Sequence, residues 1–255
     1  MTRVIKVGGR PQLDASLPIA LSAANLASPG SLVIVHGGGD EVSMLQKLYG
    51  TTSEFKGGRR VTSEIDLEII RMALSGSANK RLVSALVDGG VPAIGLSGED
   101  AGLLTATPFG EGTLGFVGVP AEVNVGLLQH LLAGGYVPVL SPVSRSAVNA
   151  FGATLNVNGD DAAAAFAIAL EADELLLVSD VEGVMADGEV LTAITTEDAQ
   201  RLIDEGTAKG GMGAKLQAAT KALDGGVGRV RISDIAAIED LERGTVLTRV
   251  GSVYA

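Results

Sequence analysis

The sequence predicts an α/β fold, a three-layer αβα sandwich around a central, mostly parallel sheet. Two observations lead to this fold class. Short runs of β-branched residues and leucine alternate with longer segments of helical pattern, which is typical of crossover connections between parallel strands. The strand candidates are also apolar almost throughout, as expected when helices cover both faces of a sheet. With 255 residues, the chain is long enough for one large domain or two closely joined lobes.

Six short segments are strand candidates, and the first of them begins at residue 3. They are residues 3–7, 32–36, 93–96, 137–140, 174–179 and 229–232. Longer segments with a helical pattern lie between them. The helix candidates are residues 13–27, 41–49, 63–89, 123–133, 161–170, 197–205 and 214–224. Within the third of these, Ser75 and Gly76 predict an interruption.

Two segments depart from this alternation. Residues 103–119 contain four glycines among alternating residues and predict one or more hairpins. Residues 181–191, with the sequence ADGE at 186–189, predict another hairpin. We place a soft boundary near residue 170, where the chain passes from one set of glycine-rich motifs to another. Residues 1–170 and 171–255 would then be two lobes of one continuous fold.

The composition argues against several classes of partner and site. A formal net charge of −11 makes the surface a poor partner for nucleic acid. The absence of cysteine excludes disulfides and thiolate metal sites, and two histidines argue against a histidine-rich metal site. No apolar run approaches the roughly 18 residues of a membrane helix, and Lys6 interrupts the first apolar run, unlike in a secretory signal. We therefore expect a cytoplasmic protein with no nucleic-acid or membrane partner.

Two glycine-rich turns follow strand candidates. VIVHGGGDEV (33–42) places three glycines directly after a β-branched run, and VIKVGGR (4–10) places Lys6 just ahead of two more. Such turns lie at the carboxyl edge of a parallel sheet, where open α/β folds bind ligands. Backbone N–H groups without a neighbouring Cβ can approach phosphate oxygens closely. A tight turn without a ligand explains one such loop, but two loops and a lysine favour an anion site. Neither loop matches the P-loop or dinucleotide pattern.

Four further stretches place polar residues at the ends of elements. GGRRVT (57–62) is either a carboxylate-binding arginine pair or a solvated basic turn. NVNGDDAA (156–163) has four polar residues at a helix start, of which capping explains one. VSDVEGV (178–184) places polar residues at the end of a buried strand, where they form either a loop that binds a ligand or an ordinary turn. KGGMGAK (209–215) puts Lys215 in the first turn of a helix, against the helix dipole, and this suggests an anionic ligand.

Taken in order, the motifs IKVGG, VIVHGGG, GRRVT, NVNGD, SDVEGV and GGMGAK resemble those of the amino acid kinase family. The resemblance runs from Arg3 to the C-terminus. Within the family, it is closest to the enzymes of arginine biosynthesis that phosphorylate the side-chain carboxylate of N-acetyl-L-glutamate. It implies the amino acid kinase fold, with ATP and Mg²⁺ as cofactors. Residues 1–170 would bind the amino acid and form the dimer, and residues 171–255 would bind ATP.

The chemistry of this family accounts for the residue types. The acceptor carboxylate has a reference pKa of about 4.3 and is ionised at pH 7, so no general base is needed. Catalysis is then positioning plus positive charge. The resemblance implies that Lys6 and Lys215 flank the transferred phosphoryl group, with Asp160 between them as organiser. Mg²⁺ would sit mainly on the phosphates, with few protein ligands.

The resemblance also implies the binding residues. Arg60 would grip the α-carboxylate of the substrate, and the glycines would donate their N–H groups. The implied substrate-binding residues are Gly9, Gly37, Gly38, Arg60, Asn156 and Asn158. The implied nucleotide-binding residues are Ser179, Asp180, Val181, Gly183, Val184, Met185, Lys209 and Gly211.

The sequence departs from the family pattern in a few places. Gly159 stands where alanine is common, Arg10-Pro11 stands where an apolar residue is usual, and Arg59 doubles a single expected arginine. Two residues precede the first strand candidate, where arginine-inhibited relatives carry a helix that links dimers. We therefore expect a homodimer without that feedback.

Other functions stay open at this point. A sister enzyme of lysine biosynthesis phosphorylates α-aminoadipate or glutamate attached to an acidic carrier protein, and it shares the phosphate motifs. It needs a basic surface, whereas residues 103–118 contain no Lys or Arg. Carbamate, aspartate, uridylate and glutamate 5-kinases share the fold but fit the motif combination less well. A non-catalytic sensor of nucleotide or amino acid is a third class, and the presence of both lysines and Asp160 argues against it.

Overall fold

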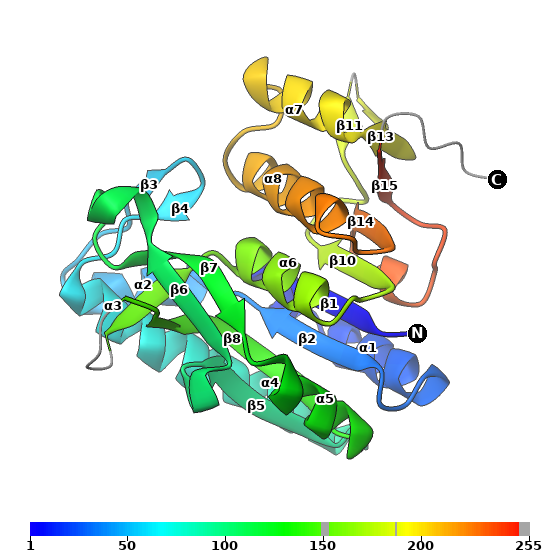
Figure 1. Cartoon of the computed structure of the whole chain (residues 1–255), viewed down its shortest axis with the longest axis horizontal. Coiled ribbons are helices and arrows are strands. Elements are labelled where there is room, and N and C mark those ends of the chain that lie inside the picture. The colour runs from blue at the N-terminus through cyan, green and yellow to red at the C-terminus, as the bar shows by residue number, and fades with distance from the viewer. Residues whose placement is uncertain (149–152, 187, 250–255) are drawn as a thin grey trace.

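A computed structural model describes residues 1–148, 153–186 and 188–249. One 11-stranded sheet runs through the molecule, and helices cover both of its faces (Figure 1). Most strand pairs are parallel, and antiparallel pairs occur where β14 (Arg229–Ser233) meets β15 (Thr245–Thr248) and in the β6–β9 region. The predicted three-layer α/β architecture is confirmed.

All six predicted strands are present in the sheet. β1 (Arg3–Val7) and β2 (Leu32–His36) have the predicted bounds. The others differ by one or two residues at one end, except for one that is six residues longer. They are β5 (Ala93–Gly98), β8 (Val137–Ser146), β10 (Glu174–Val178) and β14. The extension of β8 arises because its second half pairs with strands that the sequence did not predict.

These additional strands complete the sheet on both sides. β6 (Leu104–Pro108) and β7 (Val117–Val123) form the predicted hairpin. β9 (Thr154–Val157), β13 (Ala193–Thr195) and β15 were not predicted. Two small hairpins lie outside the sheet. One is the predicted β11 (Met185–Ala186) and β12 (Glu189–Val190), whose turn includes residue 187 outside the described residues; the other is β3 (Phe55–Lys56) and β4 (Arg59–Arg60).

Every predicted helix is present. They are α1 (Ser16–Ala27), α2 (Gly39–Leu48), α3 (Glu64–Ile70), α4 (Asn79–Asp88), α5 (Val125–Ala133), α6 (Gly159–Ala169), α7 (Thr196–Asp204) and α8 (Gly210–Asp224). The predicted interruption near Ser75 is a π-helical segment, η2 (Arg71–Ala78), through which α3 continues into α4. Such wider turns occur frequently at functional sites.

The position of Lys215 in its helix was predicted wrongly. α8 begins at Gly210, four residues earlier than expected, with Lys209 as its N-cap residue. Lys215 therefore lies in the second turn, where the dipole of the helix N-terminus is weaker. The dipole argument for an anionic ligand at Lys215 does not hold, and the case for this lysine rests on its contacts.

The two faces of the sheet bury different side chains of the same strand. Val4 packs in the core beneath α6 and α8, whereas Ile5 and Val7 pack in the core beneath α1 and α4. Because side chains alternate along a strand, Lys6 points to the α6 side. β1 also pairs with β2 and with β10 over its whole length, so Lys6 is held in the centre of the sheet.

Candidate active site

Lys6, Asp160 and Lys215 form a buried cluster of charged side chains. The ammonium nitrogen of Lys6 lies 2.8 Å from Asp160 Oδ1. The Lys215 nitrogen lies 3.0 Å from the same oxygen and 3.2 Å from Oδ2. The three side chains come from β1, α6 and α8, so the fold brings together three residues that are far apart in the sequence. The structure brings these three predicted residues together, and their catalytic role stays a prediction.

One carboxylate between two ammonium groups leaves a local excess of positive charge. Burial would raise the pKa of Asp160, but the charges of Lys6 and Lys215 outweigh it and lower the pKa to about 2. Burial lowers the pKa of Lys6 to about 8, and Lys215 adds to this shift while Asp160 opposes it. Asp160 is therefore ionised at pH 7, and the cluster attracts an anion that can share the two ammonium groups.

The start of α6 fixes the position of Asp160. The side-chain oxygen of Asn158 accepts hydrogen bonds from the N–H groups of Asp160 (2.8 Å) and Asp161 (3.4 Å), so Asn158 is the N-cap of the helix. A Cβ on Gly159 would lie 3.2 Å from Lys6 Cε, which is tighter than most such contacts. Glycine at 159 thus leaves room for the Lys6 side chain.

The two glycine-rich loops face each other beside this cluster. A Cβ on Gly9 would lie 3.4 Å from Gly39 N, so the loops are nearly in backbone contact. Gly38 has φ +150°, and a Cβ there would lie 2.7 Å from Leu74 Cδ2, so this position requires glycine. Within the described residues, the N–H groups of Gly9 and Gly38 have no hydrogen-bond partner.

The prediction that Gly37 donates its N–H to a ligand is corrected by the structure. That N–H donates to the carbonyl oxygen of Val7 at 3.0 Å, which extends the pairing of β1 and β2. Gly37 lines the cavity, but the donors that remain for a ligand come from Gly9 and Gly38.

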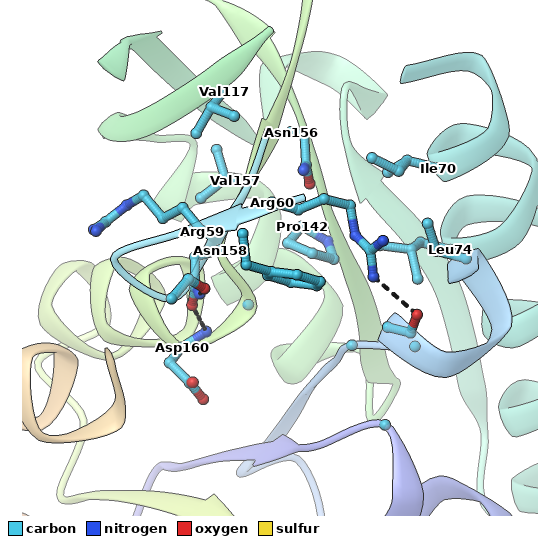
Figure 2. A pocket seen from close by; sticks show the side chains of 18 of the residues that line it. Arg59, Arg60, Ile70, Leu74, Val117, Pro142, Asn156, Val157, Asn158 and Asp160 are labelled. Atoms are coloured by element: carbon cyan, nitrogen blue, oxygen red, sulfur yellow. Dashed lines mark hydrogen bonds between the residues drawn. The ribbon is translucent and has the colours of Figure 1, made fainter. Parts of the chain in front are cut away.

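A cavity of about 190 Å³ lies between these loops, the β3–β4 hairpin and the start of α6 (Figure 2). Its polar lining includes all the predicted substrate-binding residues and two of the three predicted catalytic residues. These are Gly9, Gly37, Gly38, Arg60, Asn156, Asn158, Lys6 and Asp160. Apolar side chains also line the wall: Val42, Phe55, Ile70, Leu74, Val117, Pro142 and Val157. The cavity is suited to a small anionic molecule with an apolar part.

A second cleft, of about 330 Å³, adjoins the first. Both are lined by Lys6, Gly9 and Asp160, and Lys215 lines only the second. Ser179, Asp180 and Gly211, three of the residues predicted to bind nucleotide, also line the second cleft. The charged cluster thus lies where the two spaces meet.

The other residues predicted to bind nucleotide have different surroundings. Val184 is in the core, and its N–H and carbonyl groups bond to Thr245 and Leu191. A Cβ on Gly183 would lie 2.6 Å from Thr245 Oγ1, so packing explains that glycine. Val181 lies in the loop that follows Asp180, Met185 is exposed on β11, and Lys209 is the exposed N-cap residue of α8. Their contact with a nucleotide stays a prediction.

The two arginines of the β3–β4 hairpin point in different directions (Figure 2). Arg59 forms a 2.6 Å ion pair with Asp161 of α6. Arg60 is buried and turns toward the glycine loop, where its Nη2 donates to the carbonyl oxygen of Gly39 at 2.9 Å. The ring of Phe55 lies 4.5 Å from the Arg60 guanidinium carbon. Arg60 is therefore the arginine next to the glycine loop, whereas Arg59 fastens the hairpin to α6.

A buried histidine behind the glycine loop has a role that the sequence did not indicate. His36 Nε2 accepts from the amide of Asn79 (3.0 Å), so Nδ1 carries the proton and donates to the Gly37 carbonyl (2.9 Å). Burial lowers the pKa of His36 to about 4, so the ring is neutral at pH 7. His36 was visible in the HGGG motif, but no pattern in the sequence pointed to Asn79.

Among the described residues, no helix has the length and apolar character needed to cross a bilayer. The described parts of the chain also contain no group of three or more His, Cys, Asp or Glu side chains placed to hold a metal ion.

Comparisons with known proteins agree with this geometry. A model described as the amino acid kinase family matches residues 1–234. The acetylglutamate kinase of Chloroflexus aurantiacus is 44% identical over 93% of either chain. That of Geobacillus stearothermophilus is 42% identical over 91% of this chain and 89% of its own. Among solved structures, smu.665 from Streptococcus mutans UA159 has a TM-score of 0.87 at 32% identity, covering 97% of this chain and 98% of that one.

Substitution of the loop glycines tests the geometry of the site. Gly38→Ala should destabilise the protein by about 1–3 kcal/mol, because the backbone conformation is unfavourable and the new Cβ meets Leu74. Gly37→Ala is the matched control, since its Cβ would have no neighbour closer than the Val7 carbonyl at 3.9 Å. Urea unfolding of both variants measures the difference. Equal losses of stability would contradict this account of the loop.

Proposed function

The chain belongs to the amino acid kinase family, and we propose that it transfers the γ-phosphoryl group of ATP to the side-chain carboxylate of N-acetyl-L-glutamate. The product is N-acetyl-L-glutamyl 5-phosphate, an intermediate of arginine biosynthesis. The observation that carries this proposal is the cluster of Lys6, Asp160 and Lys215 at the junction of the two cavities. The identity to relatives named acetylglutamate kinase supports the choice of acceptor.

The reaction brings one anion against another, and the cluster supplies the opposing charge. The acceptor carboxylate attacks the γ-phosphorus, and the bond from that phosphorus to the β–γ bridging oxygen breaks to release ADP. No proton has to leave the acceptor, because its carboxylate is ionised. Lys6 and Lys215 neutralise the charge of the phosphoryl group in transit, while Asp160 keeps both ammonium groups in place. The N–H groups of Gly9 and Gly38 are neutral hydrogen-bond donors to the same phosphoryl group.

We propose that each lobe provides one of the two substrate sites. The residues that line the smaller cavity all lie between residues 6 and 160, and this supports binding of the acceptor by residues 1–170. Residues of both lobes line the adjoining cleft, and the part contributed by Ser179, Gly211 and Lys215 supports binding of ATP by residues 171–255. Arg60 and the Asn156 and Asn158 side chains face the acceptor, with Arg60 next to its α-carboxylate.

Mg²⁺ that accompanies ATP would be held by the phosphates. The only carboxylate of the cluster, Asp160, already contacts two ammonium groups. We therefore place the ion on the phosphates and assign it no protein ligand.

Two further properties are proposals of the same kind. We propose that the protein is a homodimer and that it acts in the cytoplasm, as its motifs and composition indicate. Light scattering of the purified protein tests the mass in solution.

The choice of acceptor is tested by a coupled assay of ADP release. We expect kcat/KM for N-acetyl-L-glutamate to exceed the values for glutamate, aspartate and α-aminoadipate by at least about tenfold. The acetylated nitrogen carries no charge to desolvate in a cavity with an apolar wall. Carrier-bound α-aminoadipate as the best acceptor would establish the sister activity of lysine biosynthesis. ATP that binds but stays intact with every acceptor would indicate a sensor.

Removal of one ammonium group tests the catalytic role of the cluster. Lys215→Ala should lower kcat by about a hundredfold or more, because a charge that stabilises the transition state contributes on the order of 3 kcal/mol. Steady-state kinetics and ATP binding should show that kcat falls far more than affinity for ATP. Lys221→Ala, at an exposed position of the same helix, serves as the control. A near-normal kcat for Lys215→Ala would remove that residue from the mechanism.

The pH dependence follows from the lowered pKa of Lys6. A lysine is charged below its pKa, so the free enzyme should lose the active form as pH rises through about 8. We expect kcat/KM for ATP to fall above that pH, whereas kcat should persist to higher pH, because bound phosphate favours the charged amine. Measurement of kcat/KM for ATP and of kcat from pH 6 to pH 10 tests both expectations. A kcat/KM that stays flat to pH 10 would contradict the assignment.

A further inference from the structure

The guanidinium group of Arg60 is surrounded by neutral acceptors. Nη1 donates to Gln46 Oε1 at 2.6 Å and to Ser53 Oγ. Nη2 donates to the Gly39 carbonyl oxygen and, at 3.1 Å, to Ser43 Oγ. Among the described residues, no carboxylate lies within 4 Å of this buried arginine, unlike Arg59, which is paired with Asp161. The positive charge of Arg60 is therefore held in place without being neutralised.

Gln46 is the fully buried member of this shell, and its amide has only one consistent orientation. Its Nε2 donates to Asp66 Oδ1 at 2.5 Å, while its Oε1 accepts from Arg60. A carboxylate can only accept and a guanidinium can only donate, so an amide between them must turn its NH₂ toward Asp66. Gln46 therefore separates Asp66 from Arg60 by one side chain and bonds to both.

Asp66 is itself fixed at the start of α3. Its Oδ2 accepts from the N–H (3.0 Å) and Oγ (2.6 Å) of Ser63, in a capping box. Thr51 Oγ1 donates to Oδ1 at 3.3 Å. Burial would raise the pKa of Asp66, but the hydrogen bonds from Ser63, Gln46 and Thr51 lower it, so the carboxylate is ionised at pH 7. Asp66 is thus a stable acceptor that sets the orientation of Gln46.

We propose that Gln46 is a positioning residue that fixes Arg60 against the acceptor cavity while leaving its charge available to the carboxylate of the acceptor. The inference rests on the proposed function. A glutamate side chain at this position would pair with Arg60 and compete with the substrate for it. An apolar residue would leave Arg60 Nη1 with Ser53 Oγ as its one remaining acceptor among the described residues. A neutral amide of this length satisfies the hydrogen bond and keeps the charge uncompensated.

The isosteric substitution Gln46→Glu tests this proposal directly. The charged groups that face position 46 are Arg60 from β4 and Asp66 from α3, and Asp40 of α2 also acts on Arg60 at longer range. The introduced carboxyl group would bond as the glutamine does while it is protonated, whereas it would neutralise Arg60 once it is ionised. KM for N-acetyl-L-glutamate, relative to the wild type, should therefore rise with pH between 5.5 and 8.5 and reach about tenfold or more. KM for ATP should stay within about twofold.

Gln200→Glu is the matched control, because Gln200 Nε2 also donates to an aspartate, Asp204 Oδ1 at 2.8 Å, but at an exposed site on α7. It should change neither KM. A Gln46→Glu enzyme whose KM for N-acetyl-L-glutamate matches the wild type at pH 8.5 would overturn the proposal. A rise without pH dependence that affects ATP equally would do the same, since it would indicate a general loss of structure.

A second variant keeps the test decisive if Gln46→Glu does not fold. Asp66→Asn preserves the size of the side chain but no longer dictates which way the Gln46 amide turns. We expect KM for N-acetyl-L-glutamate to rise severalfold and KM for ATP to be unchanged; an unchanged KM for N-acetyl-L-glutamate would overturn the proposal. Failure of the proposed function looks different, because the wild-type enzyme itself would then not release ADP with N-acetyl-L-glutamate.

Discussion

The ion cluster at Asp160 is the constraint on which the rest of the site depends. Two buried ammonium groups would repel each other, and a single carboxylate between them offsets that repulsion while leaving one positive charge in excess. This arrangement explains why the start of α6 is so closely defined. Asn158 caps the helix and fixes the direction of Asp160, and Gly159 leaves space for the Lys6 side chain. In the reaction proposed above, the acceptor carboxylate is already ionised and needs no general base. His36, the histidine nearby, is a neutral support for the glycine loop.

A similar balance of charge applies at Arg60. Among the described residues, one of the two adjacent arginines has its charge paired with a carboxylate and the other does not. Arg59 forms an ion pair with Asp161 and so links the β3–β4 hairpin to α6. Arg60 makes several hydrogen bonds, all to neutral atoms within the described residues, and so keeps its charge for a ligand. A structural ion pair and the anion recognition that we propose for Arg60 are thus divided between neighbouring residues of one short strand, whose side chains point to opposite sides.

The sequence predicted the layers, the central strands and the family because these depend on local patterns: apolar runs, helix periodicity and the order of glycine motifs. It failed where pairing over long distances decides the outcome. β9 is too short to be recognised until β8 is seen beside it. The N–H of Gly37 donates to Val7, and both backbone polar groups of Val184 are hydrogen-bonded in the core. The sequence motifs indicate neither of these bonds. The neutral shell of Arg60 joins residues from α2 and from the loop that follows it, and no spacing rule connects them to Arg60.

The pairing of β1 with β10 has a consequence for the order in which the molecule can be built. β1 leaves the ribosome before the other strands of the sheet, and one of its edges can pair with β2 after about 30 residues. Its other edge has to wait for Glu174–Val178, more than 160 residues later in synthesis. During that interval the nascent chain carries an apolar strand with an open edge, the feature that most readily recruits a foreign strand. Lys6, in the middle of that strand, has no buried carboxylate partner until Asp160 emerges, and an unpaired charge at such an edge discourages misplaced pairing. The residue that we assign to phosphoryl transfer would therefore protect its own strand while the protein is being made.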